Sequence, residues 1–174
     1  MEVKEAIQKR KSIRKYKDKK LDKNIINELI EAARLSPSAK NTQTWKFKLV
    51  TDEKTKKLLK ENKVFRQDFV YTAPLIIVCC ADYKSYPESK GGEYSNVSPR
   101  ERAITDLAIA SQSLVLRATE LGLGSCYVGL LNERKLKKLL NIPENFILNY
   151  VITIGYTDEE GIKTTRKEKE EILI

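Results

Sequence analysis

Apolar residues recur at two different spacings along this chain, and the spacing predicts which segments are helices and which are strands. Between residues 22 and 35 they follow a helical period, with Asp22 placed to cap the helix and Pro37 to stop it. Residues 45–50 alternate large apolar side chains with lysine, which is the pattern of a half-buried strand. Residues 73–82 form an apolar run rich in β-branched residues, and this run predicts a central strand.

The longest helical pattern covers residues 100–122 and is apolar almost all round between Ile104 and Leu121. A helix of this kind must be buried on most sides, either at the centre of the molecule or across a subunit interface. Shorter helices are expected at 2–9, 53–62 and 132–140, and further strands at 125–129 and 146–157. Because helices and strands are interleaved, we expect a single α+β or α/β domain spanning residues 1–174.

One long segment carries neither pattern. Residues 84–99 contain two prolines, two glycines and four serines, and this composition predicts a mobile loop. Such a loop is either a lid over a binding site or an excursion without a function, and the residues alone do not decide between the two. The polar tail from Gly161 onwards is expected to leave the core.

Composition excludes several classes of protein and of site. A chain with 41% hydrophobic and 33% charged residues is globular and not disordered. No apolar run approaches the ~20 residues that cross a bilayer, and the first residues lack the apolar core of a signal peptide. We therefore expect a cytoplasmic protein with no membrane partner, and three cysteines without a CxxC motif fit a reducing compartment. The absence of histidine rules out Ser-His and Cys-His triads and His-ligated metal sites. We predict no metal site, and the identity of any catalytic residue stays open.

Positive charge is concentrated in one short stretch. Residues 9–20 carry eight cationic side chains and one anionic side chain, Asp18, which gives +7 of the chain's total of +9. On an extended chain Arg10, Ser12 and Arg14 project to the same side, so two guanidinium forks would flank a hydroxyl in a suitable phosphate site. A solvated basic face explains the same residues equally well.

Two further segments could carry chemistry. The amides of SPSAKNTQTW, residues 36–45, could read a polar heterocycle, although a capped helix exit is the simpler interpretation. In ELGLGSCYVG, residues 120–129, two glycines resemble the start of a dinucleotide fingerprint. Residue 127 is tyrosine, however, and the order runs from helix to strand, so this is no Rossmann phosphate loop. What remains is a tight turn with bare backbone, which a flat ring could approach or which needs no ligand.

Four motifs follow one another in an order that carries a family resemblance. They are RKSIRKY at 10–16, SPSAKNTQTW at 36–45, a segment from Asp106 that ends in GLGSCYVG at 129, and IGYTDEEGIKTTRK at 154–167. Each motif alone is weak, but the four in this order resemble the nitroreductase-like flavoproteins. The resemblance covers the chain from about residue 3 to residue 170.

The resemblance implies an α+β, nitroreductase-like fold with a central, mostly antiparallel sheet flanked by helices, in an intertwined homodimer. It implies FMN as the cofactor and NADH or NADPH as the reductant. The partner substrate would be a small-molecule electron acceptor such as a nitroaromatic or a quinone, which receives a hydride through flavin N5. Because the cofactor carries this chemistry, a protein without histidine can perform it.

The resemblance also implies which residues bind the cofactor. Arg10 and Arg166 are similar to phosphate ligands, with Lys11 and Ser12 beside them, and Arg14 resembles the cation near the ribityl chain and the pyrimidine edge. A second group, Pro37, Ser38 and Ala39, resembles the segment that reaches the flavin from the other subunit, and Asn41 and Gln43 would support that segment. A third group resembles the stretch that lines the isoalloxazine ring, and it comprises Tyr127, Val128, Gly129 and Leu130.

Two positions depart from the family's pattern. Thr44 stands where the family commonly has proline, and we expect this change to loosen the turn. Larger members contact the pyrimidine from the region that corresponds to residues 62–70, where this chain offers only Arg66 or Gln67.

Two other functions compete with a flavoenzyme. The first is a nucleic-acid-binding protein that uses residues 9–20. The sequence argues against it, because Tyr16 is the one aromatic residue among these cations and the rest of the chain adds only about +2. The second is a flavin-binding sensor or storage protein without turnover, and the sequence leaves this alternative open.

Overall fold

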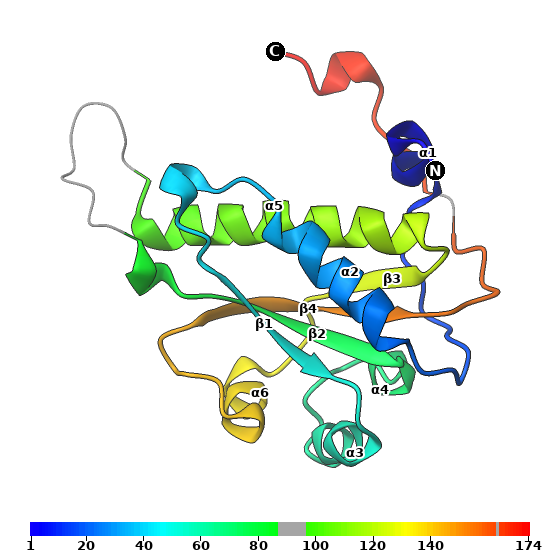
Figure 1. Cartoon of the computed structure of the whole chain (residues 1–174), viewed down its shortest axis with the longest axis vertical. Coiled ribbons are helices and arrows are strands. Elements are labelled where there is room, and N and C mark those ends of the chain that lie inside the picture. The colour runs from blue at the N-terminus through cyan, green and yellow to red at the C-terminus, as the bar shows by residue number, and fades with distance from the viewer. Residues whose placement is uncertain (87–96, 163) are drawn as a thin grey trace.

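The computed structural model describes residues 1–86, 97–162 and 164–174, and it contains a four-stranded sheet between two layers of helices (Figure 1). The strands are β1 (Trp45–Val50), β2 (Leu75–Ala81), β3 (Gly124–Val128) and β4 (Ile147–Gly155). They lie in the order β1-β2-β4-β3, and each neighbouring pair is antiparallel. The predicted α+β class with an antiparallel sheet is therefore confirmed.

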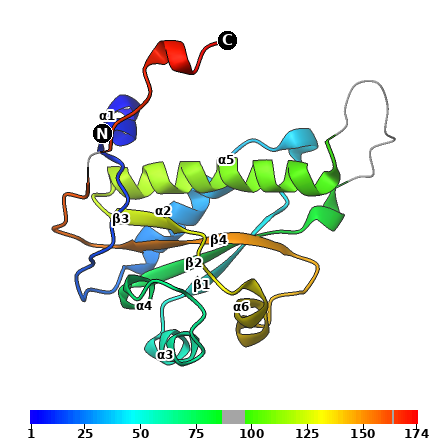
Figure 2. The same cartoon turned by 180° about the vertical axis from the view of Figure 1, so that it is seen from behind.

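The helices divide between the two faces of the sheet (Figures 1 and 2). One face is covered by α2 (Lys23–Arg34) and α5 (Pro99–Glu120), and the other by α3 (Glu53–Glu61), α4 (Phe69–Thr72) and α6 (Glu133–Leu140). Helix α1 (Val3–Lys9) lies near the end of α5, beside the C-terminal tail in both views. Short 3₁₀ turns occur at Ala39–Asn41, Tyr83–Ser85 and Lys169–Glu171.

Strand β2 is the central strand that its apolar run predicted. All seven of its residues are buried, because β1 and β4 flank it and helices cover both faces. Its odd-numbered residues belong to the apolar cluster under α2 and α5, and its even-numbered residues to the cluster above α3 and α6. Because successive side chains of a strand point to opposite faces, β2 contributes to the apolar clusters on both sides of the sheet.

The other predicted elements are confirmed with ends that differ by one or two residues, while α4 and the three 3₁₀ turns were not predicted. Most of the loop predicted at 84–99 lies outside the described residues. The described residues beyond Gly161 are exposed, as expected for the tail, and Ile172, Leu173 and Ile174 lie in solvent. Among the helices that the structure describes, none is long and apolar enough to cross a membrane.

Helix α5 begins at a capping box and buries one face against the sheet. The Ser98 hydroxyl accepts a hydrogen bond from the Glu101 N–H, and the Glu101 carboxylate accepts one from the Ser98 N–H. The sequence predicted burial on most sides, but a single chain leaves Ala108 and Ile109 exposed, and Ile109 keeps 40% of its accessible surface. Part of the apolar surface of α5 is therefore not covered within one chain.

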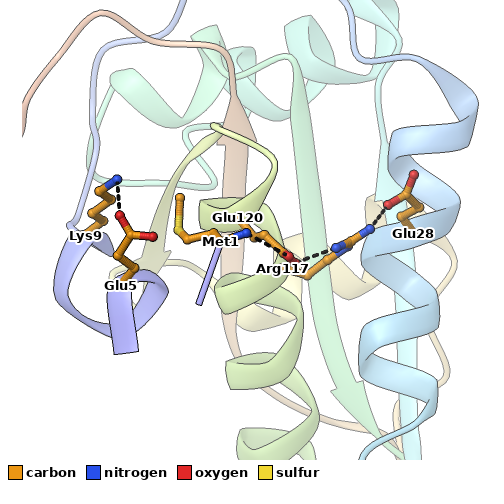
Figure 3. Close-up of polar contacts among 6 residues, drawn as sticks. All are labelled: Met1, Glu5, Lys9, Glu28, Arg117 and Glu120. Carbon is orange, nitrogen blue, oxygen red and sulfur yellow. Dashed lines mark hydrogen bonds and ion pairs between the residues drawn. The ribbon is translucent and has the colours of Figure 1, made fainter. Parts of the chain in front are cut away.

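A chain of ion pairs ties the N-terminus to α5 and α2 (Figure 3). The Met1 amino group lies 3.7 Å from a Glu120 oxygen, Glu120 pairs with Arg117 at 2.5 Å, and Arg117 also pairs with Glu28 of α2. These groups are partly exposed, so each pair contributes little by itself. They connect the start of the chain, just before α1, to α5 and α2, and α1 leads directly into the basic stretch.

The basic stretch passes over β3 at very close range. A Cβ atom added to Gly124 would lie 2.7 Å from Cγ2 and 2.9 Å from Cβ of Ile13, which is 5% exposed. Ile13 therefore fits only because residue 124 has no side chain, and this contact sets the height of residues 12–14 above the strand.

We predict that Gly124→Ala pushes this stretch off β3. Overpacking at a buried contact costs about 1–3 kcal/mol, and the loss of unfolding free energy can be measured by urea denaturation. Ser125→Ala in the same strand is the control, since it removes an atom and leaves the Ile13 contact unchanged. Equal stability of Gly124→Ala and the wild-type protein would contradict the close fit.

Candidate functional site

The basic stretch is extended, as predicted, and runs alongside β3. Ser12 forms a parallel bridge with Ser125, and the Ile13 N–H donates to the Ser125 carbonyl at 2.9 Å. Ile13 points into the core, so the neighbouring Ser12 and Arg14 face the opposite way. The guanidinium groups of Arg10 and Arg14 form no hydrogen bond or ion pair with the described residues.

A carboxylate of the same chain holds this stretch from the outside. One Glu159 oxygen accepts the N–H groups of Arg14 at 2.7 Å and of Lys15 at 2.9 Å. The Thr157 hydroxyl donates to the Lys15 carbonyl at 2.8 Å and accepts from the Glu159 N–H at 2.8 Å. On the inner side, the Tyr16 hydroxyl donates to the Ile13 carbonyl at 2.7 Å. The backbone that presents Ser12 and Arg14 is therefore fixed from both sides.

The cationic side chains act on β3 at close range. Burial raises the pKa of the Cys126 thiol, and the positive charges of Arg14 and Arg10 and the nearby Ser12 side chain oppose this rise. These three side chains thus lie within electrostatic reach of the middle of β3. Lys11 lies at the edge of the group, where its side chain contacts Gly161 at the start of the tail.

The end of β3 presents an exposed backbone beside an aromatic pair. Tyr127 keeps 38% of its surface exposed and meets Tyr150 edge-on at 5.3 Å between ring centroids. Burial raises the pKa of the Tyr127 phenol above its ordinary value, so the hydroxyl stays protonated well into the alkaline range. Gly129 and Leu130 are exposed, and neither donates its N–H to another described residue. Val128 is buried and anchors the segment.

Residues 64–66 hold the turn that follows β3. The Arg66 N–H donates to the Leu130 carbonyl at 3.1 Å, and the Asn132 N–H donates to the Val64 carbonyl at 2.7 Å. A depression of about 680 Å³ opens here, lined among others by Lys60, Lys63, Arg66 and Leu130. Of the two candidates in 62–70, Arg66 is thus the one that bonds directly to the proposed ring-lining stretch.

The second predicted group forms a compact turn at the other edge of the sheet. The Gln43 N–H donates to the Ser38 hydroxyl at 3.0 Å, and the Gln43 side chain donates to the Asn41 amide oxygen at 3.2 Å. Pro37 is exposed and Ala39 half-buried. This turn precedes β1, whereas Tyr127 ends β3, and β1 and β3 are opposite edges of the sheet, about 14 Å apart at the usual strand spacing.

Thr44, at the position where the resemblance led us to expect proline, is fully buried just before β1. Its carbonyl accepts the Asp82 N–H at 2.8 Å, while its hydroxyl has no partner among the described residues. Gln43 before it has a φ of 49°, a conformation that a following proline disfavours.

The structure brings Arg10, Ser12 and Arg14 alongside β3, where Ser12 is bridged to Ser125, but it does not bring Arg166 to them. The Arg166 guanidinium donates to the Thr165 carbonyl at 3.1 Å and to the Thr164 side chain. Its segment nevertheless departs from Gly161, which packs against Lys11 and Ile13. The tail therefore begins beside the basic stretch.

Sequence reasoning missed two residues that organise the site. Asp106 is a charged residue inside the apolar pattern of 100–122, and that conflict was a signal of a specific partner. Glu159 gave no local signal, because the N–H groups that it accepts lie 144 and 145 residues away in the chain.

Comparisons with known proteins identify the family. The nitroreductase family profile matches residues 7–156, so the chain belongs to the nitroreductase family. A protein of Archaeoglobus fulgidus named NADH dehydrogenase/NAD(P)H nitroreductase is 34% identical over 155 residues, covering 87% of this chain and 83% of the relative. A protein of Methanothermobacter thermautotrophicus with the same name is 34% identical over 163 residues, covering 91% and 79%.

Solved structures agree with this assignment. A nitroreductase family protein from Clostridium novyi superposes with a TM-score of 0.77 at 31% identity, covering 91% of this chain and 87% of the other. An FMN-dependent nitroreductase from Clostridium difficile superposes with a TM-score of 0.73 at 29% identity, covering 95% and 92%. The resemblance seen in the sequence and the fold that it implied are both confirmed.

We predict that Arg10→Ala combined with Arg14→Ala weakens FMN binding by ~2–4 kcal/mol, because each guanidinium would lose a charge-assisted hydrogen bond to phosphate. Calorimetric titration of flavin-free protein with FMN measures the loss. Lys19→Ala combined with Lys20→Ala removes the same charge from the same basic stretch and serves as the control. Wild-type affinity in the arginine double variant would refute this phosphate site.

Proposed function

We propose that this protein binds FMN and uses it to pass a hydride from NADH or NADPH to an electrophilic small molecule such as a nitroaromatic or a quinone. Membership of the nitroreductase family makes the chain an NAD(P)H-dependent oxidoreductase, and an FMN-dependent nitroreductase is among its structural neighbours. One observation carries the site proposal. The basic stretch runs along β3, and the turn after β3 contains Gly129 and Leu130. Along this one edge of the sheet, the guanidinium groups of Arg10 and Arg14 and the N–H groups of Gly129 and Leu130 have no partner among the described residues.

The donor set at one end of this edge fits a phosphate. Arg10 and Arg14 supply planar forks of N–H donors, and the Ser12 hydroxyl supplies a neutral donor between them. Neither arginine loses a protein partner on binding, since neither has one among the described residues. The cost of binding an anion here is therefore small.

The other end of the edge fits a flat ring. Gly129 has no side chain, so a ring can approach its backbone closely, and the N–H groups of Gly129 and Leu130 can donate to ring-edge acceptors. Bound FMN would supply the hydride transfer itself. The protein's part is to orient the ring, and Arg66, which lies beside Leu130, would place positive charge where a reduced ring gains negative charge.

We further propose that the protein is a homodimer in which residues 37–39 approach the partner's flavin. Within one chain these residues lie at the opposite sheet edge from Tyr127, too far away to contact a ring bound there. In a dimer they could instead contact the ring bound to the partner. The exposed Ala108 and Ile109 of α5 and the apolar end of the tail provide surface for such an association.

The first test is the near-ultraviolet and visible absorbance spectrum of the purified protein, before and after anaerobic addition of NADH or NADPH. Flavin bands that bleach on addition would support the reducible flavoenzyme. Bands that persist with both reductants would favour a flavin-binding protein without turnover. No bands after soaking with FMN would overturn the flavin proposal and revive the nucleic-acid alternative, which titration with labelled oligonucleotides would then examine.

The dimer makes a separate prediction. Ile109→Asp should shift the protein towards a monomer in light scattering coupled to size exclusion, because it places a charge in an apolar contact. Leu58→Asp on α3 is a matched control, since Leu58 is 39% exposed on the opposite face of the sheet and Ile109 is 40% exposed. A dimer that survives Ile109→Asp would place the interface elsewhere.

A further inference from the structure

A buried carboxylate of α5 holds the turn that the proposed function places against the flavin. Asp106 is 3% exposed, and one of its oxygens accepts the Ala39 N–H at 3.1 Å. Its other oxygen lies 3.4 Å from the Thr42 hydroxyl, which shares its single proton between this oxygen and the Ala39 carbonyl at 3.0 Å. Asp106 takes part in none of the ion pairs of the described residues. These hydrogen bonds therefore compensate for the burial of its carboxylate.

A second contact from the same helix holds the start of the turn. The Ser36 hydroxyl donates to the Ser113 hydroxyl at 2.8 Å. Asp106 and Ser113 are seven residues apart, which is two helical turns, so they lie on the same side of α5. Residues 37 and 38 therefore span the interval between two points that are fixed on one rigid helix.

The backbone of this turn is strained. Lys40, Asn41 and Gln43 have φ values of 54°, 54° and 49°, in the left-handed region that side chains disfavour. Such a turn persists only where surrounding contacts over-determine it. The Asp106 oxygens supply those contacts at Ala39 and Thr42, on either side of two of the three strained residues.

We propose that Asp106 is a positioning residue, which holds residues 37–39 in the conformation that contacts the flavin. The inference rests on the proposed function for the identity of the ligand, but the tether itself requires no ligand. It assigns to α5 a role in the partner's cofactor site, because α5 holds the residues that reach the partner's flavin.

We expect asparagine at position 106 to preserve the hydrogen bonds that hold the turn, and alanine to remove them. In Asp106→Asn the new side chain can still accept the Ala39 N–H through its oxygen. Its amide can donate to the Thr42 hydroxyl oxygen, and the Thr42 proton, no longer shared with residue 106, then goes to the Ala39 carbonyl alone. Rescue by Asp106→Asn therefore separates a tether made of hydrogen bonds from a requirement for buried negative charge.

The first readout needs no flavin. Lys40 is exposed in the tethered turn, so trypsin should cut after Lys40 faster when the tether is lost. In flavin-free protein we expect about a tenfold faster cut at this bond for Asp106→Ala, and a rate within about threefold of wild type for Asp106→Asn. Mass spectrometry of the first fragments assigns the bond.

The second readout is FMN affinity. We expect the dissociation constant to rise about tenfold or more for Asp106→Ala and to stay within about threefold for Asp106→Asn. Leu136→Ala in α6 is the control for general destabilisation, because Leu136 is fully buried in the cluster on the other face of the sheet. It should lower the unfolding temperature without selective cutting at Lys40 and without weakening FMN binding.

Each outcome of these two assays supports or overturns the positioning role of Asp106. If Asp106→Ala behaves like Leu136→Ala, or if Asp106→Asn behaves like Asp106→Ala, the positioning role is wrong. If Asp106→Ala does not fold, Thr42→Val breaks the contact from the turn side, and unchanged cutting and affinity there overturn the proposal. If the wild-type protein binds no FMN, the proposed function fails, while the cutting assay still tests the tether.

Discussion

The packing of α5 on the sheet is the contact on which the other parts of the molecule depend. Its buried face is lined by Ala103, Ala110 and Ala118 together with leucines and a valine, and these small residues let the helix lie close to the strands and to α2. From this one helix three parts of the site are placed. The C-terminal end turns into β3, the middle holds Tyr150 through Ser111 at 2.9 Å, and the N-terminal half holds the turn before β1.

The regular elements could be predicted from the sequence because their signals are local. The lysines that alternate with apolar residues in 45–50, or the unbroken apolar run that became β2, report the environment of a strand without knowledge of its neighbours. Helix α4 has four residues, too few for a period to be visible, and so it was not predicted. The exposed Ile109 shows a different limit, since the apolar pattern of α5 describes surface that one chain does not cover.

The candidate site was predicted in composition but not in arrangement. Spacing alone suggested that Arg10, Ser12 and Arg14 share a side, and the bridge between Ser12 and Ser125 gives that side a location. That bridge joins residues more than a hundred positions apart, and no local pattern encodes such a pairing. The division of the site between the two edges of the sheet has the same origin, because strand order is a property of the folded chain.

The bond from Glu159 to the backbone of Arg14 and Lys15 has a consequence for the rate of ligand capture. Since the protein's own carboxylate keeps this stretch in shape, an arriving anion meets a surface that is already formed and orders little further chain. Encounter is then governed by long-range attraction to the cluster of cations in 9–20. Capture of an anionic ligand should accordingly slow as salt is added, while the shape of the surface that receives it stays the same.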